Sequence, residues 1–267
     1  MKMRLQSVTL WLALVSLVGS SWIGCETVPE TGRHQLNLIS ADQEMQLGLA
    51  SFDQTKKDVP ISRDAASNAL LQRVGSRIAA SVKTRLPNAR WEFVLFESKE
   101  ANAFCLPGGK VGVYTGILPI TKDEAGLATV LGHEIAHATA HHGSERMSEQ
   151  MVVQGLGSAL GAGVNAYNPK LTALTMQVYG AGAQVGRELP HSRAQEAEAD
   201  EIGLYYMAQA GFPPEAAVAF WERFSAYINA QGGNSTPGFL RTHPLDADRI
   251  AHLKTLLPKA KALYHPQ

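Results

Sequence analysis

The feature that most constrains this chain is the stretch His133-Glu134-Ile135-Ala136-His137, which reads H-E-x-x-H. Small apolar residues precede it from position 125 to 130, so the pattern predicts a buried helix over residues 121–142. Two imidazoles four residues apart lie on one face of a helix, where both can reach one metal ion. Polar side chains on a buried helix need partners, and a metal ion provides one for both histidines. We therefore interpret His133 and His137 as metal ligands.

Glu134 lies between the two histidines and is predicted to be the general base. A carboxylate beside a metal can take a proton from an attacking water and later deliver it to a leaving amine. The five-residue stretch thus supplies two ligands and a base, which together are typical of metal-assisted hydrolysis.

A second helix, expected over residues 192–209, carries the acidic residues from which a third ligand can come. A hydrolytic zinc site has three protein ligands and leaves the fourth position to water. Glu196 and Asp200 are four residues apart and share a face, so one can bind the metal while the other accepts a hydrogen bond from a ligand imidazole. Spacing alone does not choose between them. Glu198 points to another face and is expected in solvent.

Three further histidines need an interpretation. His141 follows His137 by one helical turn, but the helical rise puts it roughly 12 Å along the axis from His133, too far to share a metal with it. His141 and His142 are therefore expected at the helix end or on the surface. His243 precedes Pro244 and is expected in an extended segment. It can be a structural histidine or part of the site.

The N-terminus has the layout of a targeting segment. Lys2 and Arg4 precede an apolar run over residues 8–18, and Ile23-Gly24-Cys25 resembles the end of a bacterial lipoprotein signal. We predict a signal peptide over residues 1–24 and lipidation of Cys25. Ordinary secretion with cleavage nearby and a retained anchor helix are the alternatives. Residues 25–39 are expected to be an extended tether and residues 40–260 the folded domain.

The remaining pattern predicts a mostly helical domain with a small sheet. Strands are expected over residues 91–96 and 110–114, with a turn at 107–109, and the second strand could pair with an extended peptide or be part of a plain structural hairpin. Residues 144–164 and 171–185 are expected to be helices of small residues that pack internally, cover the site or contact lipid. The chain of 267 residues is 45% hydrophobic and has zero formal net charge, which suits a sizeable core and gives no indication of nucleic-acid binding.

Four segments together resemble one family. Residues 102–109, 133–137, 192–200 and 242–244 are similar to the gluzincin metallopeptidases that include the CAAX prenyl proteases, the HtpX-type heat-shock proteases and the periplasmic proteases BepA and LoiP. The resemblance implies an α+β fold, a predominantly helical zincin-type domain with a small β-sheet beside the metal helix. It implies zinc, one ion per chain, on His133, His137 and Glu196, with Asp200 supporting a ligand and His243 near the zinc or the reacting groups. It implies a substrate cleft along Asn102 and the strand Lys110, Val111, Gly112, Val113 and Tyr114.

The function expected from this resemblance is zinc-dependent hydrolysis of peptide bonds in misfolded or unassembled envelope proteins. The predicted location is the periplasm, with a lipid anchor in the outer membrane, since Glu26 rather than aspartate follows Cys25. The outer-membrane assembly machinery is an expected partner. The alternative is a chaperone or assembly factor whose site is latent because His243 is a fourth ligand. A purely structural zinc lipoprotein would leave Glu134 without a role.

Overall fold

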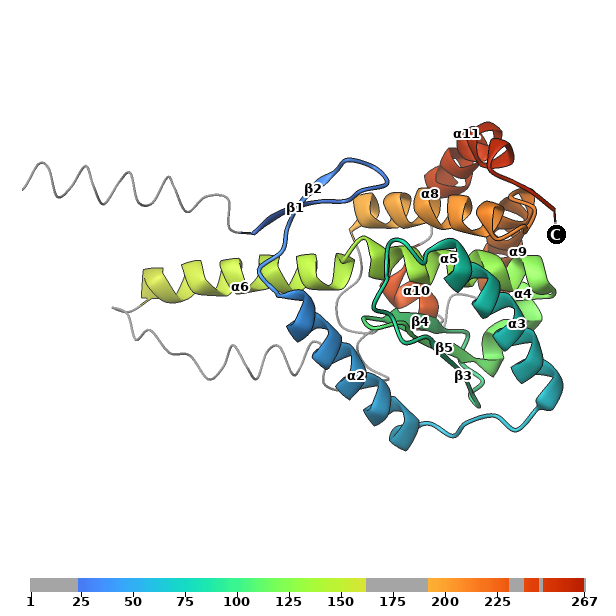
Figure 1. Cartoon of the computed structure of the whole chain (residues 1–267), viewed down its shortest axis with the longest axis horizontal. Coiled ribbons are helices and arrows are strands. Elements are labelled where there is room, and N and C mark those ends of the chain that lie inside the picture. The colour runs from blue at the N-terminus through green and yellow to red at the C-terminus, as the bar shows by residue number, and fades with distance from the viewer. Residues whose placement is uncertain (1–23, 162–191, 231–237, 245–246, 267) are drawn as a thin grey trace, which may run out of the picture.

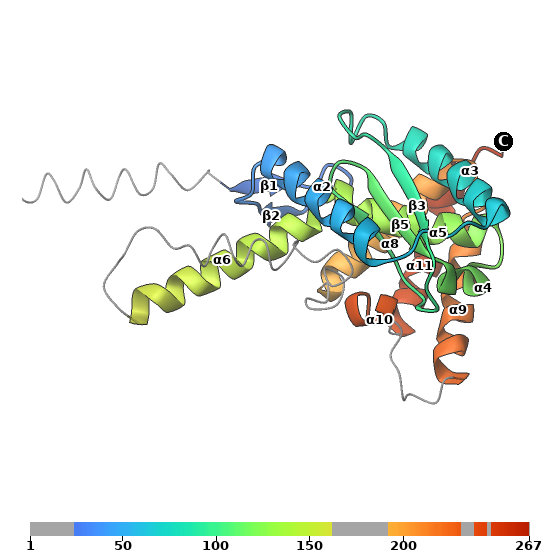
Figure 2. The same cartoon turned by 90° about the horizontal axis from the view of Figure 1, so that it is seen from below.

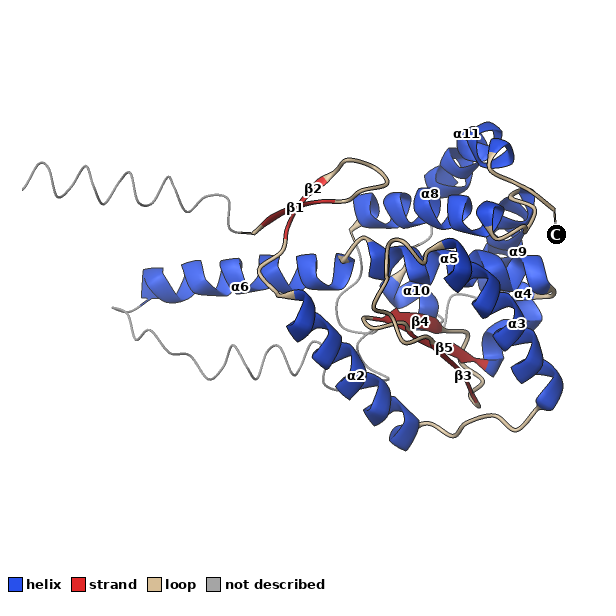
Figure 3. Cartoon of the chain, viewed as in Figure 1, coloured by secondary structure: helices blue, strands red, loops and turns tan. Residues whose placement is uncertain are grey.

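The computed structural model describes residues 24–161, 192–230, 238–244 and 247–266 (Figure 1). Helices dominate and the strands are short (Figure 3), so the predicted α+β class is confirmed. The signal peptide up to residue 23 and the helix expected at 171–185 lie outside the described residues. The elements are β1 (Cys25–Thr27), β2 (His34–Leu36), α2 (Ala41–Asp58), α3 (Ala65–Ser81), β3 (Glu92–Phe96), β4 (Ala103–Leu106), β5 (Lys110–Tyr114), the 3-10 helix η1 (Thr115–Ile117), α4 (Leu118–Thr121), α5 (Glu124–Thr139), α6 (His142–Gly161), α8 (Arg193–Gln209), α9 (Glu215–Ala230), α10 (Gly238–Thr242) and α11 (Ala247–Ala262).

The central sheet has the strand order β3-β5-β4, with β5 parallel to β3 and antiparallel to β4. Side chains alternate across it, as the two-residue period of a strand requires. Phe93, Leu95, Val111 and Val113 belong to the main core shared with α3 and α5. The opposite face forms a separate aromatic cluster with α2, made of Phe52, Phe96, Leu106 and Tyr114 together with the partly buried Val59, Val94 and Phe104. The sheet is thus covered on both faces by helices.

Helix α5 is buried over nearly its whole length and crosses α8 closely. The crossing point is formed by Gly132 and Gly203, where a Cβ on Gly132 would come within 2.7 Å of the Gly203 carbonyl oxygen. Only glycine at both positions permits this approach. The contact places the first turns of α8 directly over the second half of α5.

Capping residues set the starts of these two helices. The Asp123 side chain accepts a hydrogen bond from the backbone N–H of Gly126 at the start of α5. Ser192 and Gln195 form a capping box at the start of α8. Both arrangements satisfy backbone donors that have no partner inside the helix.

The metal-bearing helix is shorter than predicted. It ends at Thr139, and His141 adopts a left-handed conformation with φ 54° before α6 begins at His142. Helix α6 then runs outward from the body of the molecule (Figure 2). Among the described residues, no helix combines the length and the apolar character needed to cross a bilayer.

The segment expected as a tether over residues 25–39 is a short hairpin packed on the domain. Strands β1 and β2 pair in antiparallel register, and Val28 between them is fully buried in the main core. The sequence did not indicate this because three-residue strands give no clear alternation of polar and apolar residues. Figure 1 shows the hairpin above α6, with its loop next to the N-terminal end of α8.

Candidate metal centre

Helices α5 and α8 bring the three predicted metal ligands together. The Nε2 atoms of His133 and His137 lie 3.1 Å apart. One carboxylate oxygen of Glu196 is 3.4 Å from His133 Nε2 and the other is 3.4 Å from His137 Nε2. All three side chains are buried. The choice between Glu196 and Asp200, which spacing left open, therefore falls on Glu196.

These three donor groups fit a tetrahedral zinc ion. Ligand atoms 2.0–2.1 Å from zinc in tetrahedral geometry are separated by about 3.3 Å. The separation of 3.1 Å between the two Nε2 atoms is close to that value, and each imidazole has one Glu196 oxygen at 3.4 Å. Two imidazoles and a carboxylate are also the donor set of hydrolytic zinc sites. The residues present thus suit zinc.

Asp200 and Arg249 support the first ligand. The Nδ1 atom of His133 lies 3.0 Å from Asp200, and Arg249 donates two hydrogen bonds of 2.8 Å to the same carboxylate. Burial opposes protonation of His133, but the hydrogen bonds and charges of Asp200 and Glu196 outweigh it and raise the pKa of His133 to about 9. Since a ligand imidazole must be neutral, metal binding has to displace this proton.

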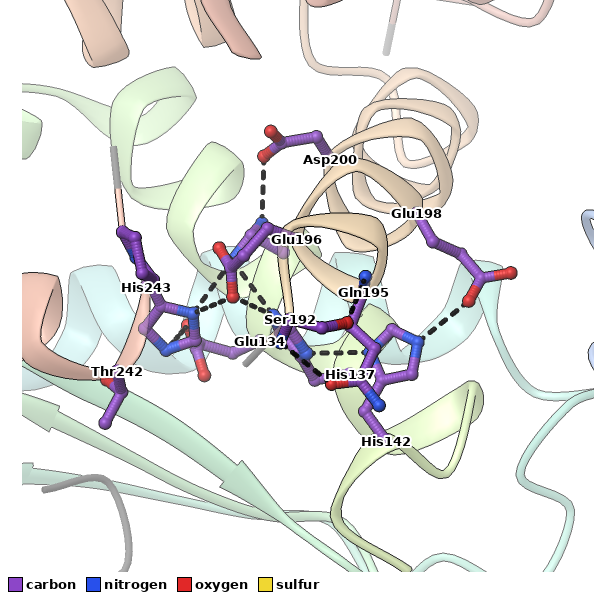
Figure 4. Close-up of polar contacts among 12 residues, drawn as sticks. Glu134, His137, His142, Ser192, Gln195, Glu196, Glu198, Asp200, Thr242 and His243 are labelled. Carbon is purple, nitrogen blue, oxygen red and sulfur yellow. Dashed lines mark hydrogen bonds and ion pairs between the residues drawn. The ribbon is translucent and has the colours of Figure 1, made fainter. Parts of the chain in front are cut away.

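His142 and Glu198 support the second ligand (Figure 4), and both differ from the sequence prediction. The Nδ1 atoms of His142 and His137 are 2.8 Å apart, and His142 Nε2 is 2.9 Å from Glu198. His142 is fully buried rather than on the surface, and Glu198 is buried rather than solvated. The helix break at His141 is the physical reason, because it turns the His142 ring back toward His137. Burial lowers the pKa of His142 and so disfavours the charged form of the ring.

Glu134 is buried beside the three ligands. Burial raises the pKa of its carboxyl group, because the loss of water disfavours the charged form. Its Oε1 atom lies 3.4 Å from Nε2 of His243. Desolvation and the charge of Glu134 together raise the pKa of the Cys105 thiol, which disfavours the thiolate form that a nucleophile needs.

His243 belongs to the cluster. It follows α10, and its Nδ1 atom lies 3.0 Å from Glu196 and 3.2 Å from His133 Nε2. Together with His133, His137 and Glu196 it forms a buried group whose ligand atoms lie within 4.8 Å of one another. His141, in contrast, bonds to Glu44 at 2.8 Å and lies away from this group, as the helical rise predicted.

The predicted substrate strand needs a correction. Strand β5 pairs with β3 on one side and β4 on the other, so its backbone has no edge to offer a peptide. The Lys110 side chain bonds to Glu92 and to the carbonyl of Arg90. The outer edge of β3 is bridged at Ile61, whereas the outer edge of β4 has no strand partner in the described part of the chain. Asn102, which is buried, directly precedes β4.

Arg249, His142, Glu198 and Arg33 were not identified from the sequence as parts of the site. Arg249 also lies 2.8 Å from Glu196 and stacks on Trp221. Arg249 lies six residues after His243, but in the sequence nothing distinguishes it from the exposed charged residues of the same helix. The other three have no local signal, because their role depends on a helix break and on a short hairpin.

Comparison with known proteins decides the family. The model of peptidase family M48 matches residues 65–257. The chain belongs to this family. It is 34% identical to the mitochondrial metalloendopeptidase OMA1 of Schizosaccharomyces pombe over 88% of its own length and 67% of the relative's. It is 31% identical to the beta-barrel assembly-enhancing protease of Escherichia coli over 85% of its own length and 46% of the relative's.

This M48 member spans about half to two thirds of the length of such relatives, since for the Saccharomyces cerevisiae OMA1 the share is 50% at 38% identity. The matched region contains both metal-bearing helices and His243. The expected resemblance to the gluzincin family is therefore confirmed, and the buried group of His133, His137 and Glu196 fits the zinc site of an M48 metallopeptidase domain.

Proposed function

We propose that this protein is a zinc-dependent endopeptidase that cleaves misfolded or unassembled proteins of the cell envelope. The observation that carries the proposal is the position of Glu134, a buried carboxylate with a raised pKa beside three donor groups spaced for zinc. A metal site with only a structural role needs no such base.

Each residue of the site has a separate role in the proposed reaction. Zinc on His133, His137 and Glu196 would supply Lewis acidity toward the scissile carbonyl and the attacking water. Glu134 takes the proton of that water and delivers it to the amine that leaves. The Asp200 carboxylate lies 3.0 Å from Nδ1 of His133 and favours the tautomer with its proton on Nδ1, which leaves Nε2 as the ligand atom. His243, between Glu134 and Glu196, is placed to donate to the reacting carbonyl oxygen.

The substrate is expected to bind as an added strand on β4. An extended peptide can use the unpaired backbone groups of a sheet edge, and β4 contacts α5, the helix that bears Glu134. This assignment keeps the predicted cleft near Asn102 and moves the pairing strand from β5 to β4. Binding through backbone groups also suits a peptidase that accepts unfolded chains of varied sequence.

The cell-envelope role is supported by the N-terminal pattern and by one relative. Cys25 is exposed at the start of β1 and is free, as a lipid-bearing residue would be. The Escherichia coli relative is named for beta-barrel assembly. We therefore place the protein in the periplasm, anchored through Cys25 to the outer membrane, with unassembled envelope proteins and the outer-membrane assembly machinery as partners.

Hydrolysis of casein by the purified, zinc-loaded full chain tests the proposal. The parent should cleave, and Glu134→Gln should reduce cleavage by about two to four orders of magnitude because the proton acceptor is lost. The variant should still bind one zinc ion, since Glu134 is not a ligand. Equal cleavage by the parent and Glu134→Gln would overturn the proposed mechanism.

A second function is favoured by His243. Its Nδ1 atom lies inside the group of ligand atoms, where a fourth protein ligand would occupy the position that water needs. The protein would then act mainly as a chaperone or assembly factor with a latent peptidase site.

His243→Ala separates the two functions. If His243 assists the reaction, its removal lowers casein cleavage. If it blocks the site, its removal raises cleavage, and Glu134→Gln keeps the ability of the parent to prevent aggregation of an unfolded barrel protein. The expected result of the first proposal is the lowered rate.

A further inference from the structure

The N-terminal hairpin reaches the metal centre through a chain of polar contacts. Arg33, in the loop just before β2, donates to Glu198 at 2.6 Å. Glu198 is 2.9 Å from His142 Nε2, and His142 Nδ1 is 2.8 Å from Nδ1 of the zinc ligand His137. Side chains from four separate elements thus form one line that ends at the metal position.

With a neutral His142 ring, the hydrogen-bond donors in this line have one consistent arrangement. Glu198 accepts from Arg33 and from the Thr31 hydroxyl, and an ionised carboxylate has no proton to give. His142 must therefore donate to Glu198 through Nε2–H. A neutral imidazole then has a lone pair at Nδ1, so His137 donates to His142 through its own Nδ1–H. The tautomer of His137 is fixed with a lone pair at Nε2, the atom that faces the metal.

Arg33 also holds the hairpin in place. Its two terminal nitrogens bond to Glu145 at 2.5 and 2.9 Å, and Glu145 in turn accepts from Gln195 at the start of α8. Glu145 and Glu198 have side chains only 7% and 5% exposed. Two buried carboxylates without a cation between them would repel each other, so the guanidinium is what allows both to lie beside the site.

We propose that the hairpin is a working part of the zinc centre, in which Arg33 is a positioning residue that acts on His137 through Glu198 and His142. The inference rests on the proposed zinc site and extends it to a segment outside the region matched by the family model. Removing a polar group that supports a ligand histidine costs about 10- to 100-fold in metal affinity. Since Arg33 acts through Glu198 and His142, the loss of zinc affinity on removing Arg33 should be at the lower end of that range.

The test is the zinc dissociation constant of the full chain, measured by competition with a chromophoric chelator. Arg33→Met should weaken zinc binding by about tenfold. Arg85→Met is the matched control, because Arg85 pairs with Glu30 of the same hairpin loop at 2.8 Å but lies outside the line to His142. It should leave the zinc affinity within about twofold of the parent, as expected for a partly exposed pair.

A double-mutant cycle distinguishes an effect of Arg33 on His137 through His142 from a general loss of fold stability. In a His142→Phe background the line is already broken, so Arg33→Met should have no further effect on zinc affinity. His142→Gln should restore most of the affinity lost in His142→Phe, because a glutamine amide can accept from His137 and donate to Glu198. If Arg33→Met fails to fold, Glu198→Gln replaces it in the same cycle.

Two results would overturn the inference. One is parent-like zinc affinity in Arg33→Met. The other is an equal loss in the parent and His142→Phe backgrounds, which would mean that the hairpin only stabilises the fold. Because the readout is zinc binding, it stays informative if casein is not cleaved, and casein cleavage with unchanged zinc affinity would reject this inference alone.

Discussion

The two zinc-binding histidines come from one turn of α5, yet opposite ends of the chain support them. His133 contacts the carboxylate of Asp200 directly, and Arg249 from α11 neutralises that carboxylate. His137 reaches a carboxylate only through His142, and Arg33 from the N-terminal hairpin neutralises it. We call Asp200 and Arg249 the C-terminal arm, and His142, Glu198 and Arg33 the N-terminal arm. Each arm ends in a carboxylate–arginine pair.

The arms differ in length and in burial. Arg249 has a side chain 5% exposed, whereas that of Arg33 is 28% exposed. Coulomb interactions weaken as solvent approaches, so the C-terminal arm should contribute more to stability and to zinc affinity than the N-terminal arm. The difference indicates that His133 is supported by a fully buried ion pair, whereas the support of His137 ends at a partly exposed arginine in the N-terminal hairpin.

The largest expected effect comes from Arg249→Met. Removing one partner of a buried ion pair leaves Asp200 and Glu196 without their cation, which costs roughly 3–5 kcal/mol of unfolding free energy. Urea unfolding of the parent and the variant in the presence of a chelator measures this loss of unfolding free energy. Arg241→Met is the control, because Arg241 pairs with Glu100 while 42% exposed and should cost about 0–1 kcal/mol. Equal losses of unfolding free energy in the two variants would mean that the buried Arg249 pair contributes no more to stability than an exposed pair.

A change in the C-terminal arm should also reduce zinc affinity more than a change in the N-terminal arm. Asp200→Asn removes the direct partner of His133 and should weaken zinc binding by about 100-fold, and Glu198→Gln by about tenfold. Both numbers come from chelator competition on the same preparation. A larger loss in Glu198→Gln than in Asp200→Asn would reverse the proposed hierarchy.

The smallest expected effect is a dependence of stability on pH in the N-terminal arm. Burial opposes ionisation of Glu198, but His142, Thr31 and Arg33 outweigh it and lower its pKa to about 2 from the ordinary 4.5. A carboxylate whose pKa is lowered in the folded state adds stability that is present above pH 4.5 and disappears as the pH falls toward 2. The stability difference between the parent and Glu198→Gln should therefore shrink over that window.

Glu222→Gln is the control for this pH experiment. Glu222 is exposed and pairs with Lys254 at the surface, so its removal should change stability little at any pH. A parent-to-Glu198→Gln difference that stays constant from pH 5 to about 2 would contradict the assignment of a lowered pKa to Glu198.

Features that depend on local periodicity, such as helices, strands and the face on which a residue lies, could be predicted from the sequence. The helical repeat placed His133 and His137 on one face, and the strands and most helices lie close to their expected bounds. The resemblance to a known family supplied Glu196, which spacing could not separate from Asp200. The rejection of His141 as a ligand also followed from helical rise alone.

The remaining features depend on contacts that no local pattern records. His142 reaches the site only because the helix breaks at His141, and Arg33 reaches it through a hairpin whose strands have three residues each. Strand β5 is central because β3, far upstream, pairs with it in parallel. The sequence indicates the turn between β4 and β5 but not the pairing of β5 with β3. For this reason β5 is expected at the edge of the sheet, whereas the structure has β4 there.

X-ray absorption at the zinc edge of the zinc-loaded full chain determines the number and type of zinc ligands. We expect one zinc ion with two imidazoles, one carboxylate and an oxygen from water in the first coordination sphere. A third imidazole would mean that His243 occupies the water position and that the latent site is the resting state. Sulfur ligands, or no stoichiometric zinc at all, would contradict the assignment of His133, His137 and Glu196 as the metal centre.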